Sequence, residues 1–299
     1  MKKRISFLVA FATFMAVILL SCSQEASKTA LAPEEAISLF LDRTYGKHDE
    51  VRNARIVRAS SVCVGTPDGE TDCNPFRDGP DEHKSDYFMK IKRMDRIGNS
   101  SYSPNESASQ SGDTYYVLVT GVGEHACHAC TGMFGAFVFE WRSGELKITA
   151  STPHLVHGSS GQPAHTWELI ELNAVGYRGW RARHGPDQWG GHLTGWDTIY
   201  APHDGKIVPL LTLGTSYLYS GPRHENRPDG NAFPEETDLI TELYPDTSDE
   251  SVAVYPMKAI IKGKLKGKQL RPKTFLIPFD EKEWKYRPSE EYETFAKQG

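Results

Sequence analysis

The sequence predicts a mainly β fold, in which an antiparallel meander, sandwich or barrel-like sheet follows one N-terminal helix; an α+β arrangement is the alternative. Two observations support this prediction. From Val51 onward, short runs rich in β-branched and aromatic residues alternate with glycine, proline, asparagine and aspartate, a pattern typical of strands and turns. Before Val51, one segment has its apolar residues at helical spacing.

The helix is predicted to begin at Ala32. Pro33 suits a first helical turn, where its missing amide hydrogen is not needed, and Glu34 and Glu35 complement the positive end of the helix dipole. Gly46 is expected to end the helix. The apolar stripe that would face a sheet consists of Ile37, Leu39, Phe40, Leu41 and Tyr45.

The predicted strands are separated by connections of unequal length. The strands span residues 54–62, 87–93, 115–122, 134–142, 146–152, 166–172, 177–183, 193–200, 207–213, 239–244, 252–261 and 275–279. Tight turns are predicted at residues 143–144, 173–176 and 202–205, and a solvated hairpin turn in the basic run 262–268. Long loops are predicted at residues 98–113, 123–133, 153–165, 184–192 and 214–236, the first of them mobile.

In an up-and-down meander, tight turns and long loops alternate along the chain. The last four long loops are therefore expected at one end of the sheet. That end would collect most of the histidines and cysteines, with three aromatic residues nearby. The residues expected there are His125, Cys127, His128, Cys130, His154, His157, His165, His184, His192 and His224, with Trp189, Tyr217 and Tyr219.

The start of the chain has the pattern of an export signal. Three basic residues precede an apolar run at residues 5–20, and the small Ser21 precedes Cys22. The segment Leu19-Leu20-Ser21-Cys22 resembles the lipobox of bacterial lipoproteins, which implies cleavage before Cys22 and acylation of that cysteine, palmitate included. The apolar run is shorter than the roughly 20 residues of a spanning helix, which disfavours an uncleaved anchor. Cleavage without lipidation is the other alternative.

These features divide the chain into a lipoprotein signal peptide at residues 1–21, a tether at residues 22–31 and one mainly β domain at residues 32–299. The part from about residue 237 could be separable. The predicted location is the cell envelope, where the N-terminal lipid would hold the protein to a membrane. Ser23, rather than aspartate, follows the cysteine, so the periplasmic face of the outer membrane is expected in a Gram-negative host.

The charge balance excludes some classes of partner. Removal of the signal peptide takes away three positive charges and no acid, so the formal net charge falls from −5 to −8. Nucleic acids and anionic lipid surfaces are bound through clustered lysine and arginine, which an acidic body does not favour. Besides the membrane, an envelope protein or a glycan is the expected partner, and no nucleic acid is expected.

Four cysteines remain when Cys22 is acylated, and an even number in an exported protein indicates disulfides. The most economical pairing joins Cys63 to Cys73 and Cys127 to Cys130. The crossed pairings stay open.

The segment 125–130 concentrates potential metal ligands. Its His125, Cys127, His128 and Cys130 could bind zinc or copper, with His154 and His157 as further ligands. An oxidising compartment favours a disulfide instead, and a lone Cys-x-x-Cys is a weak metal signal. A strand rather than a helix is predicted after Cys130, so activation of a redox-active thiol by a helix dipole is unsupported. No resident cofactor is therefore predicted, with zinc or copper as the alternative.

Other motifs are weaker. The loop at residues 185–191 contains Asp187 and Trp189, which a sugar-binding site could use for hydrogen bonding and stacking. Serine-hydrolase, phosphate-binding and dinucleotide-binding signatures are absent from the sequence, so no catalytic residue is named.

Cys127-His128-Ala129-Cys130, Trp167-Glu168-Leu169-Ile170-Glu171-Leu172 and Gly176-Tyr177-Arg178-Gly179-Trp180 give the chain a resemblance to a family of uncharacterised exported bacterial proteins, over residues 115–213. The resemblance implies a fold module and supplies no substrate.

Three functions follow from these patterns. The leading hypothesis is a lipid-anchored envelope protein with a non-catalytic binding or structural role, whose contact surface is the loop-rich end. The first alternative is a metal-binding or thiol-redox protein that uses Cys127, Cys130 and nearby histidines. The second alternative is a carbohydrate-active protein.

Overall fold

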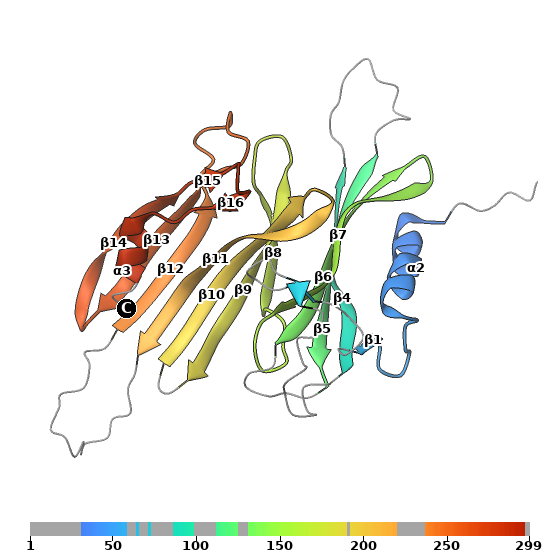
Figure 1. Cartoon of the computed structure of the whole chain (residues 1–299), viewed down its shortest axis with the longest axis horizontal. Helices are drawn as coiled ribbons and strands as arrows, with labels where there is room; N and C mark the ends of the chain where they lie inside the picture. The colour runs from blue at the N-terminus through green and yellow to red at the C-terminus, as the bar shows by residue number, and fades with distance from the viewer. Residues whose placement is uncertain are drawn as a thin grey trace, which may run out of the picture.

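The computed structural model describes residues 31–58, 64–65, 71–72, 86–98, 112–124, 131–189, 192–219 and 237–296. These residues form two mainly antiparallel seven-stranded sheets, one two-stranded sheet and two short helices, which confirms the predicted mainly β fold with an N-terminal helix. The two sheets stand next to each other, with α2 beyond the first sheet and α3 on the second (Figure 1). Neither helix of the described residues is long and apolar enough to cross a membrane.

The first sheet has the strand order β1-β4-β5-β6-β7-β2-β3. Five strands form its body, and two strands of two residues each extend it beyond β7. Its strands are β1 (Arg55–Arg58), β2 (Val64–Gly65), β3 (Thr71–Asp72), β4 (Asp86–Gly98), β5 (Asp113–Gly123), β6 (Gly132–Arg142) and β7 (Glu145–His157).

The second sheet is a seven-stranded meander in which every strand pairs with its neighbours along the chain. A small hairpin and a helix follow it. Its strands are β8 (Thr166–Glu171), β9 (Arg178–Trp189), β10 (His192–His203), β11 (Lys206–Tyr219), β12 (Thr237–Pro245), β13 (Met257–Leu265) and β14 (Lys268–Ile277). The hairpin and helix are β15 (Phe279–Asp280), β16 (Lys285–Tyr286) and α3 (Glu290–Ala296).

Helix α2 (Pro33–Tyr45) lies where the sequence predicts it. Ile37 and Leu41 are fully buried against the first sheet, as the apolar stripe requires. Arg55 of β1 donates from Nε to Asp42 of the helix over 2.8 Å. Apolar packing and this ion pair together fix α2 to the first sheet.

The tight turns are confirmed. Ser143 and Gly144 both have positive φ, as do Asp204 and Gly205, which is the geometry of hairpin turns that match the twist of a sheet. The basic run turns in the same way at residues 266–267, between β13 and β14. The predicted basic hairpin is therefore correct.

Several predicted boundaries are wrong because strands continue into predicted loops. β7, β9 and β11 extend to residues 157, 189 and 219. Pro153 ended the predicted strand, but it lies at a register shift between β6 and β7, where a proline amide is tolerated. Conversely, residues 252–256 are not strand, and β13 begins only at Met257. Residues 59–63 and most of the predicted mobile loop 98–113 lie outside the described residues.

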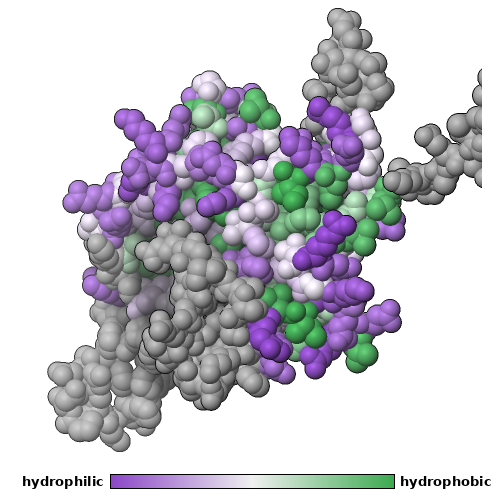
Figure 2. All heavy atoms as spheres, turned by 45° about the vertical axis from the view of Figure 1, so that its right-hand side comes forward, coloured by the Kyte–Doolittle hydropathy of each residue, from purple (hydrophilic) through white to green (hydrophobic). Residues whose placement is uncertain are grey.

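The two sheets share a buried core rich in aromatic side chains. Phe134 of the first sheet packs against Trp167 and Tyr200 of the second, with ring centroids 4.7 and 4.9 Å apart. Polar contacts also cross the interface, because Arg93 of β4 donates to the carbonyl oxygen of Trp167 over 3.3 Å. Figure 2 turns the side of α2 forward and shows hydrophobic residues in small groups among hydrophilic ones.

Candidate functional site

A cavity of about 510 Å³ lies between the second sheet and α3. Strands β10 to β13 supply one side, and Pro288 with α3 supplies the other. The size of the cavity falls within the usual range of small-molecule pockets, roughly 300–1,000 Å³.

Strand pairing explains where the cavity lies. β11 pairs with β12 only from Ser216 to Tyr219, whereas β10 and β11 pair along almost their whole length. On the side of Ser216 where the two strands are not paired, the wall of the cavity passes from Thr215 of β11 to Thr241 of β12. The cavity thus lies beside the stretch where these two neighbouring strands are not paired.

The walls are mainly apolar, with hydroxyl groups between the apolar side chains. The apolar lining residues include Trp196, Leu213, Leu239, Ile261, Tyr292 and Phe295, and the hydroxyl-bearing ones include Thr194, Thr212, Thr215, Ser216, Tyr217 and Thr241. Among the described residues of the lining, Glu293 alone carries a charge. Such a surface can bind an apolar body and form a few hydrogen bonds.

Helix α3 is held to the sheet by two aromatic side chains. Tyr292 and Phe295 both contact Phe275 of β14, with ring centroids 5.4 and 5.7 Å apart. Burial raises the pKa of Tyr292 to about 12, against a smaller lowering by a hydrogen bond with Thr241. The Tyr292 hydroxyl is therefore neutral at physiological pH and joins the helix to β12.

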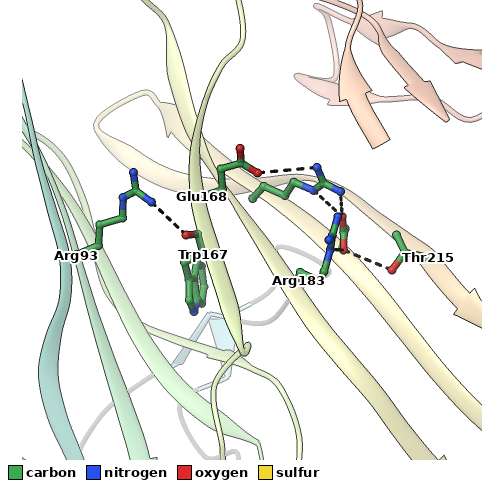
Figure 3. A network of polar contacts seen from close by, with 7 residues as sticks. Arg93, Trp167, Glu168, Arg183 and Thr215 are labelled. Carbon is green, nitrogen blue, oxygen red and sulfur yellow. Dashed lines mark hydrogen bonds and ion pairs between the residues drawn. The ribbon is translucent and has the colours of Figure 1, made fainter. Parts of the chain in front are cut away.

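A buried polar network reaches the edge of the cavity (Figure 3). Asp197 of β10 is fully buried, and Arg181 of β9 donates to its Oδ2 from Nε over 2.5 Å. Arg183 donates to Oδ1 over 3.3 Å. On the opposite side, Thr215 donates to Oδ1 over 3.4 Å, which is a long hydrogen bond. Since Thr215 also lines the cavity, it connects the network to the cavity wall.

The network balances its own charge. Besides Arg181 and Arg183 it contains Asp197 and, 4.0 Å from Arg181, Glu168 of β8. A buried charge is tolerated only when it is paired and hydrogen-bonded, and Asp197 meets this condition. The two arginine side chains are directed to Asp197 and do not line the cavity.

At the other side of the second sheet, the structure brings together some of the predicted histidines. The ring centroid of His184 lies 6.2 Å from that of His157 and 5.6 Å from that of His165. His184 Nε2 is 3.1 Å from Ser159 Oγ. His157 Nδ1 is 3.0 Å from Tyr200 Oη. Burial lowers the pKa of His157 to about 4, and the proximity of His184 contributes.

The structure separates His154 from His157. His154 packs against Tyr45 of α2, whereas His157 packs against Phe134 and Trp167 in the core between the sheets. Side chains three residues apart in a strand point to opposite faces, so the two histidines cannot share a metal ion from one loop. Within the described part of the chain, no three histidine, cysteine or acidic residues form a group that could hold a metal.

The remaining predicted site residues are not placed. Cys22, Cys63, Cys73, Cys127 and Cys130 lie outside the described residues. The same holds for His125 and His128. Asp187 and Trp189 belong to β9 rather than to a loop, and their side chains are outside the description.

The sequence interpretation missed Asp197, the two arginines and α3. A signal for Asp197 exists, because an acid stands between Trp196 and a run of strand-forming residues. A signal for α3 also exists, because Ser289 followed by acidic residues is typical of a helix start. In the structure, Ser289 Oγ accepts a hydrogen bond from the Tyr292 amide over 3.2 Å.

Comparison with protein-family models, with curated proteins and with solved structures finds no match to this chain.

Proposed function

We propose that this chain is a lipid-anchored envelope protein that binds a small amphiphilic molecule in the cavity between α3 and strands β10 to β13. The membrane anchor is the acylated Cys22 predicted from the sequence. The binding role is non-catalytic. The cavity carries the proposal, because its walls are mainly apolar and interrupted by hydroxyl groups. The proposed contact surface of the protein therefore lies under α3 rather than in the histidine-rich loops.

Physical chemistry supports binding at this position. Transfer of apolar surface from water to a protein interior is favourable by roughly 25 cal/mol per Å². An apolar ligand body would contact Leu213, Leu239 and Ile261, and Phe295 of α3 borders the same space. The hydroxyl groups would hold a polar group of the ligand in a fixed place.

The test is binding of the neutral apolar dye N-phenyl-1-naphthylamine to the mature, non-acylated protein, measured by its fluorescence. We expect saturable binding. Leu239 of β12 lines the cavity and is 8% exposed, so Leu239→Trp adds bulk from the sheet side. Ala296→Trp adds bulk from the opposite wall. Both variants should weaken dye binding about tenfold or more, which is about 1.4 kcal/mol.

The matched control is Val175→Trp, which adds the same ring at a turn residue that is 90% exposed. It should leave dye binding unchanged. Circular dichroism of each variant checks that the fold is retained. Equal dye binding by folded Leu239→Trp, folded Ala296→Trp and the wild type would refute the proposed cavity site.

A further inference from the structure

The charges around the cavity restrict what the polar end of a ligand can be. Arg181 and Arg183 are the basic residues of the network beside the cavity, and both bind Asp197. Neither is among the residues that line the cavity. An anionic group in the cavity would therefore meet no lining cation among the described residues, and it would meet the carboxylate of Glu293.

The hydroxyl group of Thr215 has a defined hydrogen-bonding role. Its hydrogen is directed to Asp197 Oδ1, so its oxygen lone pairs stay available as acceptors. Thr215 is 7% exposed, and the cavity is the space that it lines. A ligand group that donates a hydrogen bond fits this position better than one that can only accept.

The buried Asp197 keeps this arrangement in place. Its Oδ2 accepts from Arg181 and its Oδ1 from Arg183 and Thr215, so the carboxylate holds its position relative to β9 and β11. Because a charged acceptor attracts the hydroxyl hydrogen more strongly than a neutral one, the Thr215 hydroxyl is oriented before a ligand arrives.

We infer that the ligand is an amphiphile whose polar end donates hydrogen bonds, an alcohol or an amine, and that fatty-acid-like anions are selected against. The inference rests on the proposed function, because it concerns the same cavity. Thr215 accepts the hydrogen bond of the polar end, and Glu293 favours a cationic end over an anionic one. The apolar chain lies against the aliphatic and aromatic walls.

The test compares decanol, decylamine and decanoate, which share one chain length and differ in the polar end. Each displaces N-phenyl-1-naphthylamine from the wild-type protein below its critical micelle concentration. Decanol and decylamine should displace half of the dye at concentrations about tenfold lower than decanoate, because decanoate would place its charge near Glu293 and has no hydrogen to donate to Thr215.

Two variants assign the preference to its residues. Thr215→Val keeps the shape and removes the acceptor, so decanol should lose most of its advantage over decanoate. Glu293→Gln should reduce the advantage of decylamine. Glu290→Gln, on the same helix but outside the cavity lining, is the matched control and should change neither ratio.

The outcomes separate the two proposals. Equal or stronger displacement by decanoate, with Leu239→Trp still blocking the dye, would overturn the headgroup preference and leave the cavity site standing. Unchanged ratios in Thr215→Val and Glu293→Gln would also overturn it. Dye binding that neither occluding variant affects would instead refute the proposed function.

Discussion

Helices α2 and α3 each lie against one sheet, but they cover different shares of it. α2 has 13 residues and α3 has 7. At 1.5 Å per residue, α3 is therefore about 9 Å shorter than α2. α2 buries Ile37, Leu41 and Tyr45, whereas α3 buries Tyr292 and Phe295.

This difference shows how the described helices and strands leave a cavity on the second sheet. In the first sheet a longer helix packs into an apolar core that also contains Phe137 and Phe139. In the second sheet the helix is shorter, and β11 pairs with β12 only over residues 216–219, so the part of β11 before Ser216 is not paired with β12. The part of the sheet beside this unpaired stretch forms one wall of the cavity, and the Asp197 network reaches that wall through Thr215.

The first way to sharpen this comparison is to break the buried ion pair of each sheet. Asp197→Ala leaves Arg181 buried without its partner and should lower the free energy of unfolding by about 3–5 kcal/mol. Asp42→Ala breaks the pair between α2 and β1, where Asp42 is 29% exposed, and should cost about 1–2 kcal/mol. Urea denaturation measures both.

The control for these two variants is Glu250→Ala. Glu250 is exposed, so this change should lower the free energy of unfolding by about 0.5 kcal/mol or less. A smaller loss for Asp197→Ala than for Asp42→Ala would contradict the idea that the second sheet depends on its polar network.

The second prediction truncates one side chain of each helix. Leu41→Ala removes a fully buried side chain and should cost about 3–4 kcal/mol. Phe295→Ala should cost only about 2 kcal/mol, below the usual 3–5 kcal/mol for phenylalanine, because its ring already borders empty space. Thermal and urea unfolding provide the measurement. If Phe295→Ala proved the more damaging change, α3 would be packed as tightly as α2.

The third prediction concerns the core between the sheets, and it uses pH. His157 has a folded-state pKa of about 4, below the value of 6.5 for an unperturbed histidine. The unfolded chain therefore binds the proton first. The stability that depends on neutral His157 is complete above pH 6.5 and is lost as the pH falls toward 4. Between pH 7 and pH 5 the loss should be about 2 kcal/mol.

His157→Phe removes this titration and keeps an aromatic ring, so its unfolding free energy should vary less over the same pH interval. His154→Gln is the comparison on the opposite face of β7 and should retain most of the wild-type decline. Parallel pH profiles for the wild type and His157→Phe would exclude His157 as the cause.

Local signals predicted much of the fold. The turn at Ser143-Gly144 and the helix that begins at Pro33 depend on backbone preferences of single residues, which the sequence displays directly. The continuation of β7 past Pro153 could not be predicted. Only the pairing of β6 with β7 shows a register shift at this position, which tolerates a proline.

The candidate site was less predictable for the same physical reason. Asp197, Arg181 and Thr215 come from three strands, and only pairing and register bring them together. The cavity depends on where the pairing of β11 and β12 stops, which no local pattern indicates. The sequence directed attention to histidine-rich loops, since ligand-type residues cluster there in the chain.

The meander of the second sheet has a consequence for the order of folding. Among the described strands, each one from β8 to β14 pairs only with strands adjacent in the chain, so pairing within this sheet does not have to wait for a distant segment. Such local connections favour fast folding for a β protein. Helix α3 follows all seven strands. During synthesis the N-terminal part of the chain is made first. We therefore expect the open sheet to form first and the cavity to form last, when α3 docks.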